Sequence, residues 1–221
     1  MLIGYLQDST LEKQFEALNA DYAPHGISFR LKEITRTVNS RWATSGNQSD
    51  LNEMRTQLRR GDYKTVNVYY MTMVQYPAPG DILNGLCTLP TTVTSPNSTA
   101  FLRDGCLVWH VTLPGSPREA KTTTHEIGHW FGLLHTFQGG CSGTGDGVDD
   151  TPAEKTASRS CDVKRDTCPD QEGFDPVNNF MDYSPPPCRN QFTKGQGTRM
   201  HNEFFTYRLS SRANGVLSVS Q

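Results

Sequence analysis

The stretch of sequence that decides the fold spans residues 125–135 and reads HEIGHWFGLLH. Its first two histidines, His125 and His129, are four residues apart, so on a helix they lie one turn apart on the same face. Both imidazoles can then reach one metal ion at about 2.0–2.1 Å, the usual distance between zinc and a histidine nitrogen. Glu126 is one step further round the helix, where its carboxylate can approach a water molecule at the ion without being a ligand itself.

A third histidine follows six residues after His129. A continuing helix would carry His135 about 9 Å further along the axis, so the helix must end and the chain must turn back. Gly132 can adopt the positive φ that such a break requires. Three histidine ligands leave zinc one position open for water, which is the arrangement of a catalytic site. The alternative is an amphipathic core helix that happens to carry three histidines. Such ordinary core or surface positions are what we expect for the remaining histidines (His25, His110 and His201).

The composition narrows the classes of protein that this sequence can encode. With 221 residues, the chain is long enough for one or two domains with a sizeable core. A formal net charge of −2 offers no basic surface for nucleic acid, and no apolar run approaches the roughly 18 residues of a membrane span. We therefore expect neither nucleic acid nor a membrane among the partners of the protein.

Six cysteines indicate the compartment in which the protein works. No two of them have the CxxC spacing of zinc ribbons, so disulfides in an oxidising compartment are favoured, although the spacing leaves their pairing open. Asn47 and Asn97 begin N-x-S/T sequons, which would be glycosylation sites in a secreted chain. The first residues, MLIGYL, lack the basic segment and the apolar length of a signal peptide. Either the signal lies upstream of this chain, or the chain is not exported.

Periodic patterns predict regular elements along the first 135 residues. Apolar residues at helical spacing from Leu11 to Tyr22, closed by Pro24 and Gly26, predict a first helix. Further helices are expected over 51–58, capped by Ser49 or Asp50, and from the N-cap Thr193 through 207. Strands are expected over 27–34, 65–70 and 106–111. Strands that alternate with helices indicate an α/β layer.

The segment from 136 to 191 shows almost no periodicity. It holds four of the six cysteines and six of the 13 prolines. A structureless segment of this length is unusual inside a domain, so disulfides or metal ions must stiffen it, or it is disordered.

The extended motif at 125–135 resembles that of the metzincin zinc endopeptidases, which also carry a methionine turn beneath the metal. Residues 179–183, NFMDY, are similar to that turn. The stretches 129–137 and 177–188 resemble the pappalysin-type branch and are most similar to its fungal secreted extracellular metalloproteases. Shorter matches are TVN at 37–39 and GDYK at 61–64, and the resemblance as a whole covers roughly residues 11–210.

The resemblance implies a metzincin-like α/β (α+β) fold that forms a single metalloprotease catalytic domain over 1–221. An upper subdomain, 1–135, would hold a twisted sheet and the zinc helix. A lower subdomain, 136–221, would be irregular and disulfide-stapled, with the methionine turn and a C-terminal helix. The cleft between the two would carry the metal.

The family also implies a role for each residue of the motif. His125, His129 and His135 would hold one zinc ion, and Glu126 would be the general base that takes a proton from zinc-activated water. Met181 would form the apolar floor, and Tyr183 would hydrogen-bond the oxyanion. Without the family, these two would be an ordinary core methionine and a half-buried tyrosine.

The function implied is that of a secreted zinc-dependent metalloendopeptidase, expected to be a monomer, that hydrolyses peptide bonds in proteins. The family binds extended polypeptide substrates antiparallel to an edge strand just before the active helix, and 106–111 is the matching segment. One alternative is a catalytically impaired, truncated peptide-binding module of the same fold. Glu126 argues against it, because a structural site has no use for a free base. Another alternative is a metal-dependent amidase that acts on small molecules or cell-wall peptides.

Two further features follow from the comparison with the family. Related enzymes pair the cysteines after the zinc helix in an interleaved way, which gives Cys141–Cys168 and Cys161–Cys188 and leaves Cys87–Cys106 as the third pair.

Some relatives bind calcium near a loop that in this chain carries oxygen ligands suited to calcium. The alternative is a solvated acidic turn. The residues concerned are Asp146, Asp149, Asp150, Thr151 and Glu154.

Three departures from the family pattern stand out. Pro187 stands where relatives that cleave beside Arg or Lys carry an acidic residue, so we expect an uncharged pocket with an apolar or broad preference. No cysteine precedes Cys87, so this chain has no cysteine switch that could block the zinc. The extended strand that usually precedes the first helix is expected to be absent, which suggests an N-terminal truncation.

Overall fold

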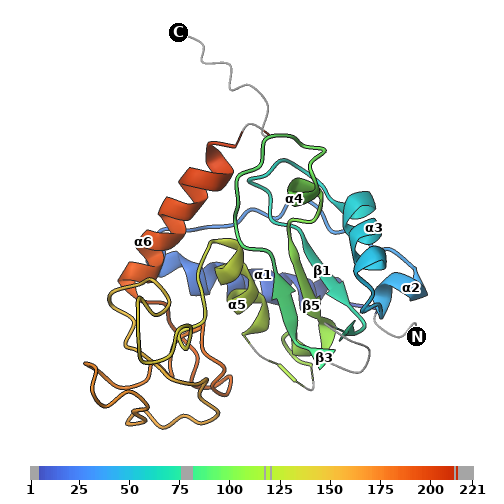
Figure 1. Cartoon of the computed structure of the whole chain (residues 1–221). Helices are drawn as coiled ribbons and strands as arrows, with labels where there is room; N and C mark the ends of the chain where they lie inside the picture. Colours follow the sequence, from blue (N-terminus) through green and yellow to red (C-terminus); the bar gives the residue numbers. More distant parts are fainter. Residues whose placement is uncertain (1–4, 76–81, 117, 120, 212, 214–221) are drawn as a thin grey trace.

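The computed structural model describes residues 5–75, 82–116, 118–119, 121–211 and 213. Its central feature is a mixed sheet of three short strands, β1 (Val68–Met71), β5 (Cys106–Trp109) and β4 (Gly85–Cys87). β1 runs parallel to β5, and β4 runs antiparallel to β5 on its other side. Figure 1 shows helix α5 (Thr122–Trp130) between this sheet and the loops of the second half of the chain.

Short helices and a small ladder complete the regular structure. The helices are α1 (Asp8–Tyr22), α2 (Ser40–Ala43), α3 (Gln48–Leu58), α4 (Thr99–Leu102) and α6 (Lys194–Glu203). The ladder pairs β2 (Val74–Gln75) with β3 (Ile82–Leu83) in antiparallel fashion. Single helical turns occur at Ala23–His25 and His110–Thr112, and a π-helical turn at Phe204–Leu209 follows α6. The fold is therefore α+β, as expected from the resemblance.

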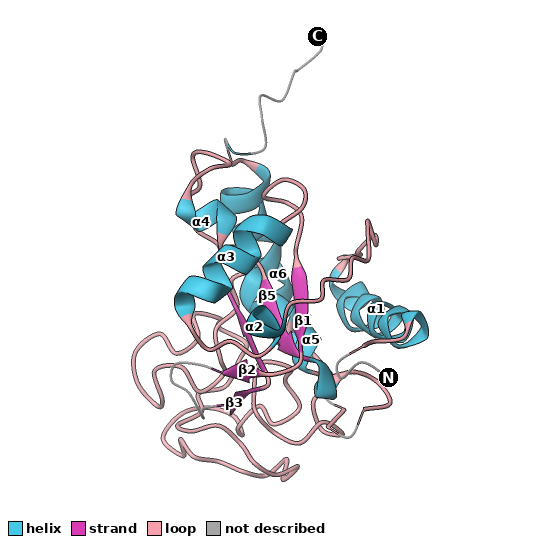
Figure 2. Ribbon diagram, turned by 90° about the vertical axis from the view of Figure 1, so that its right-hand side faces the viewer, coloured by secondary structure: helices cyan, strands magenta, loops and turns pink. Residues whose placement is uncertain are grey.

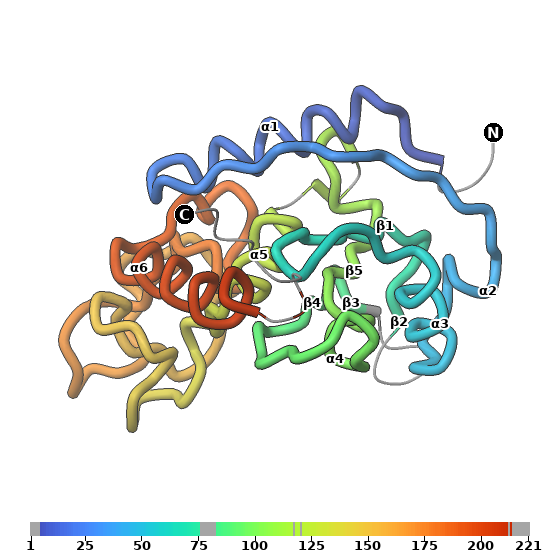
Figure 3. The backbone as a smooth tube through the Cα atoms, turned by 90° about the horizontal axis from the view of Figure 1, so that it is seen from above, coloured from blue at the N-terminus to red at the C-terminus, as the bar shows by residue number. Residues whose placement is uncertain are grey.

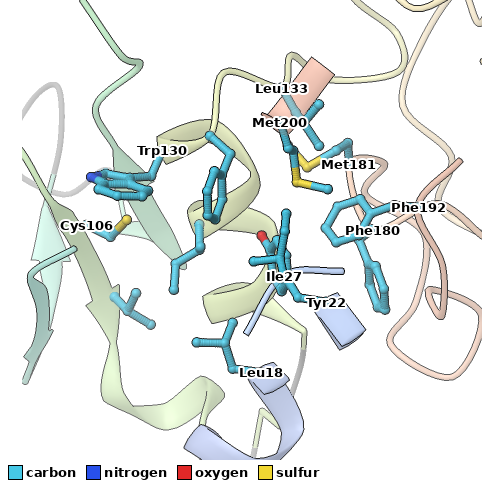
Figure 4. Close-up of a cluster of buried hydrophobic side chains, with 13 residues drawn as sticks. Leu18, Tyr22, Ile27, Cys106, Trp130, Leu133, Phe180, Met181, Phe192 and Met200 are labelled. Carbon is cyan, nitrogen blue, oxygen red and sulfur yellow. The ribbon is translucent and has the colours of Figure 1, made fainter. Parts of the chain in front are cut away.

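The central strand β5 sends its side chains to two different cores. Cys106 and Val108 lie in a cluster with the α5 residue Ile127, whereas Leu107 packs in a second cluster with residues of α3. This alternation follows from the two-residue period of a strand. Figure 2 shows α3 beside β1 and β5, and Figure 4 shows the first cluster, which reaches from α1 to α6.

Helix α1 confirms the first predicted helix, although it begins at Asp8. Its buried residues Leu18 and Tyr22 pack in the same core as Ile127 of α5. The Tyr22 hydroxyl donates a 2.9 Å hydrogen bond to the backbone carbonyl of Thr124. Gly26, at φ 70°, closes the end of the helix where Pro24 and Gly26 predicted it.

The two other predicted helices differ in how well their starts were placed. α3 is capped by Asn47, whose side chain accepts a 2.8 Å hydrogen bond from Ser49 N, so the expected caps Ser49 and Asp50 are wrong. α6 begins after Thr193 as predicted. Thr193 forms a capping box with Gln196, in which each side chain accepts from the backbone N–H of the other.

The strand predicted over 27–34 does not form. No residue from 27 to 39 belongs to a strand, and Phe29 N donates to the side chain of Asn19 instead. Phe29 nevertheless packs edge-on against Tyr22, with ring centroids 5.2 Å apart. The alternating apolar residues therefore serve a core contact with α1 rather than a ladder. Figure 3 shows this segment running back alongside α1.

The other predicted strands are shorter than expected. β1 omits 65–67, where Thr65 N donates to the carbonyl of Asp62 in a turn, and β5 ends at Trp109. The match of 106–111 to the edge strand is also wrong. Leu107 lies between Tyr69 of β1 and Leu86 of β4, so β5 is central and β4 is the end strand beside α5. A run as apolar as Cys106–Trp109 is typical of an interior strand.

The segment from 136 to 191 is held by covalent and ionic links in place of regular elements. Disulfides join Cys141 to Cys168 and Cys161 to Cys188, and a third joins Cys87 of β4 to Cys106 of β5. These are the three pairs that the resemblance implied. Arg165 adds ion pairs with the buried carboxylates of Glu154 and Asp175.

A buried ion pair ties the π-helical turn that follows α6 to the turn before β5. Arg208 and Asp104 are 0% and 1% exposed, and two hydrogen bonds of 3.0 and 3.1 Å join them. The guanidinium also lies 3.6 Å from the ring centroid of Trp130, whose indole N–H donates to Asp104 at 3.0 Å. Within the described part of the chain, no helix has the length and apolar content needed to cross a bilayer.

Replacing Asp104 by Asn is expected to lower the free energy of unfolding by about 3–5 kcal/mol, because it leaves a buried guanidinium without its counter-charge. Urea-induced unfolding followed by fluorescence measures the change. Asp170→Asn, at an exposed position, serves as the control and should change the free energy by less than about 0.5 kcal/mol. Equal stability of the two variants would contradict the assigned role of the ion pair.

Removing one of the interleaved disulfides tests how the second half is held. The double variant Cys141→Ser/Cys168→Ser opens a link with a sequence separation of 27 residues. It should lose about 3–4 kcal/mol by the chain-entropy relation. Limited proteolysis should then cut between 142 and 167 faster than in the unmodified protein. An unchanged rate of cleavage there would show that other contacts are enough to hold this segment in place without the disulfide.

Candidate metal centre

Helix α5 presents the candidate ligands, although its own sequence is a weak helix former. It opens with three threonines, whose β-branched side chains disfavour helix. Tertiary contacts hold this first turn in place. Asp21 of α1 accepts hydrogen bonds from Thr124 Oγ1 at 2.6 Å and from Lys121 Nζ at 2.8 Å. The position of the metal helix thus depends on α1.

The helix ends where the sequence predicted. Gly132 has φ 92°, its N–H donates to the carbonyl of His129 at 2.8 Å, and Leu133 N donates back to Gly128 O at 3.0 Å. These bonds satisfy carbonyl groups at the end of the helix. A Cβ at Gly132 would also lie 2.7 Å from Cγ of Glu203 in α6. The chain then turns back and brings His135 to the other two histidines.

The three imidazoles fit a tetrahedral zinc ion. The Nε2 atom of His129 lies 3.2 Å from Nε2 of His125 and 3.1 Å from Nε2 of His135. Two ligands of a tetrahedral zinc site are expected about 3.3 Å apart, given zinc–nitrogen distances near 2.05 Å. Among the residues that the structure describes, these histidines are the only group of three or more candidate ligands that comes together.

Hydrogen bonds on the far side of two rings leave the facing nitrogens free for metal. His125 Nδ1 lies 2.7 Å from the carbonyl of Phe180, and His129 Nδ1 lies 2.8 Å from that of Leu133. A nitrogen that faces a carbonyl carries the proton, so Nε2 keeps its lone pair. Burial, and then the neighbouring histidines, lower the pKa of His125, and the same causes lower the pKa of His135 to about 3. The rings are therefore neutral, which is the form that binds metal.

Glu126 lies beside the ligand set and is not part of it. The residue is 6% exposed, and burial raises the pKa of its carboxyl to about 8, opposed by the charge of Arg189. Gly85 of β4 makes room for it, because a Cβ there would lie 2.6 Å from Glu126 Oε1. The role of Gly85 was not predicted from the sequence, although a glycine within a strand often marks a close approach of this kind.

Met181 lies beneath the helix, and its position depends on Gly128 and Asn179. A Cβ at Gly128 would lie 2.5 Å from Met181 Sδ, so only glycine lets the methionine approach. Met181 N donates to Asn179 Oδ1 at 2.9 Å. Asn179 in turn exchanges hydrogen bonds of 2.8 and 3.1 Å with Gln196, the capping-box residue of α6. The start of α6 therefore positions the turn under the histidines.

Tyr183 lies at the exposed side of the centre. Its hydroxyl lies 2.8 Å from His135 Nε2, and the residue is 38% exposed. Burial, and then the charge of Glu126, raise the pKa of Tyr183, so the phenol stays protonated and can donate. The ring contacts His135 and Phe137, with centroids 4.8 and 5.1 Å away.

The other candidate residues lie apart from the three histidines. His201 Nε2 lies 2.8 Å from the carbonyl of His25, away from any group of candidate ligands within the described residues. The residues expected to bind calcium do not come together as a group of three or more acidic ligands within the described part of the chain. Glu154 accepts from Thr136 at 2.7 Å and pairs with Arg165, whereas Asp146 lines a separate cavity of about 300 Å³ with Asp149 and Thr151.

Comparisons with known proteins agree with this geometry. The model of the peptidase family described as "Pregnancy-associated plasma protein-A" matches residues 51–204. Extracellular metalloprotease 1 of Coccidioides posadasii is 48% identical over 209 residues, which are 93% of this chain and 72% of that protein. Extracellular metalloprotease of Pyricularia oryzae is 47% identical over 93% of this chain and 70% of its own length.

Solved structures show the same fold. Mirolysin in complex with a compound is similar with a TM-score of 0.75 and 25% identity, over 97% of this chain and 93% of the other. Mature mirolysin of Tannerella forsythia, in complex with a cleaved peptide, gives a TM-score of 0.70 and 26% identity over 90% and 85%. From the matched residues and the identity to its relatives, the chain belongs to the pregnancy-associated plasma protein-A family of metallopeptidases.

Proposed function

We propose that the protein is a secreted endopeptidase that uses one zinc ion, held by His125, His129 and His135, to hydrolyse peptide bonds in proteins. One observation carries the proposal. Three Nε2 atoms converge at the spacing of zinc ligands, and the carboxyl of Glu126, the residue after His125, is not one of the converging groups. The names of the fungal relatives and the three disulfides support an extracellular location.

When bound, zinc would acidify a water molecule and polarise the carbonyl of the scissile bond. Glu126 would act as the general base that takes the proton of the attacking water and passes it to the leaving nitrogen. Burial raises the pKa of this carboxyl, and the charge of a bound metal ion would oppose that rise and favour the carboxylate that accepts the proton. The close contact with Gly85 limits the positions that the carboxylate can take.

Tyr183 is suited to stabilise the charge that develops on the substrate oxygen. Its protonated hydroxyl reaches the same nitrogen of His135 that faces the other two histidines. A donor so close to the centre can hydrogen-bond the oxyanion during hydrolysis. Met181, 0% exposed beneath the rings, would keep the floor of the site apolar.

The substrate would bind as an extended strand along β4 rather than along 106–111. β4 ends the described sheet, and its Gly85 lies against the carboxyl of Glu126. An added strand would pair with free backbone groups of β4 and bring its scissile bond to the metal. In this proposal the chain is a monomer and one catalytic domain, with the site between 1–135 and 136–221. The exposed Asn47 and Asn97 would be accessible to glycosylation.

Replacing Glu126 by Ala is expected to abolish casein cleavage, with a loss of at least about 100-fold, because no other group can take the proton. Zinc content, measured by mass spectrometry of the purified variant, should stay at one ion per chain. A matched variant, Glu119→Ala, removes an exposed carboxylate and should keep both activity and zinc. A Glu126→Ala variant that still cleaves casein would overturn the mechanism. If the unmodified protein did not cleave casein, that result would favour the peptide-binding alternative.

We further propose that calcium binds at the cavity lined by Asp146 and Thr151. Asp146 Oδ2 and Thr151 Oγ1 are buried without a hydrogen-bond partner among the described residues. Burial raises the pKa of Asp146 to about 6, although the backbone N–H of Val148 donates to its other oxygen, Oδ1, at 3.0 Å. A hard cation with oxygen ligands would satisfy both atoms. Glu154, which is committed to Thr136 and Arg165, is left out of this site.

Calcium should raise the melting temperature of protein that has been stripped with chelator and refilled with zinc alone. A ligand at about 100 times its Kd adds about 2.7 kcal/mol, which corresponds to several degrees for a chain of this size. Asp146→Asn should remove the shift, whereas Asp170→Asn should keep it. A melting temperature that calcium leaves unchanged would refute the site.

A further inference from the structure

A buried arginine beside the metal centre lacks a carboxylate partner. Arg189 follows Cys188, which is bonded to Cys161, and the residue is only 9% exposed. Its Nη1 donates to the backbone carbonyl of Asp182 at 3.3 Å, and its Nε is buried without a partner. No carboxylate of the described residues lies within 4.0 Å of the guanidinium.

Three other shielded arginines among the described residues form ion pairs. Arg208 and Arg59 both reach Asp104, at 3.0 and 3.5 Å, and Arg165 pairs with two buried carboxylates. Asp182 is the nearest acidic residue in sequence to Arg189, but backbone N–H groups of Ser158 and Ser184 already occupy its carboxylate. Asp182, Tyr183 and Glu126 act on the charge of Arg189 through space, but none of them forms an ion pair with it. A buried guanidinium without an ion-pair partner is costly, which makes the residue a candidate for a functional role.

The charge of Arg189 acts on the catalytic groups. It opposes the rise in pKa of Glu126 and lowers the pKa of Tyr183 against the effect of burial. Its backbone contact is with Asp182, which lies between Met181 and Tyr183 in the turn under the histidines. A second positive charge lies at the exposed rim, where Arg159 Cζ is 5.3 Å from the ring centroid of Tyr183.

We propose that Arg189 is a specificity-determining residue that selects substrates with an aspartate or glutamate side chain next to the scissile bond. This inference rests on the proposed peptidase function. The substrate carboxylate would supply the ion-pair partner that Arg189 lacks and accept a charge-assisted hydrogen bond from the guanidinium. Pro187, which carries no charge, leaves that role to Arg189. The apolar or broad preference expected from Pro187 alone is thereby replaced by an acidic one.

Two series of quenched fluorescent peptides test the proposal, one varying the residue before the scissile bond and one the residue after it. Each series contains Asp, Asn, Glu, Gln, Leu and Arg at the varied position. In one of the series, kcat/KM for the acidic peptide should exceed that for its amide twin by about tenfold or more. In Arg189→Gln this ratio should fall to near one, and Arg189→Lys should keep part of it, because lysine retains the charge without the guanidinium fork.

The control variant Arg103→Gln removes one exposed positive charge in the turn after α4 and should keep both the ratio and the activity. Equal cleavage of acidic and amide peptides by the unmodified protein would overturn the proposal, even with the peptidase function intact. A loss of the same factor for every peptide in Arg189→Gln would assign the residue a structural role instead. If the unmodified protein cleaved none of the peptides and no casein, the proposed function itself would fail.

Discussion

The structure of this protein depends on bringing three imidazoles to one point. A single continuous helix can present only two of them, because it would carry the third away along its axis. Two rings come from α5, and the third arrives only because the chain leaves the helix at Gly132 and returns. Carbonyls of Phe180 and Leu133 fix the two helical rings from behind. Since those carbonyls belong to the methionine turn and to the returning chain, the site exists only when both halves of the molecule are assembled.

Much of the surrounding structure can be understood as support for that assembly. Asp21 of α1 holds the first turn of α5, and Gln196 of α6 holds Asn179 and thereby the methionine turn. Arg208 joins the π-helical turn after α6 to Asp104, which precedes the central strand. Two disulfides hold the segment 136–191, which lacks helices and named strands, in place. Each link joins segments far apart in sequence, so the geometry of the centre is a property of the whole fold.

The sequence predicted those features that depend on local spacing. The HExxH pattern placed two ligands on one helical face, and Gly132 predicted the break that the third ligand needs. Tyr22 and Thr193 correctly marked the end of one helix and the start of another, because capping and termination are local events. The alternation at 27–34 was misleading, since apolar residues two apart can also pack against a helix. The order of the strands was missed as well, because pairing partners are not encoded in the periodicity of one strand.

The sequence by itself therefore predicted the three histidines that come together, the candidate catalytic carboxylate and the family to which the chain belongs, because these follow from residue types at fixed short spacings. Only the tertiary structure decided how the site is shaped. It showed that Gly85 and Gly128 make room for Glu126 and Met181, and that the Nε of Arg189 is buried without a hydrogen-bond partner. These features arise where residues distant in the chain come within van der Waals or Coulomb range, and no pattern along the sequence records such distances.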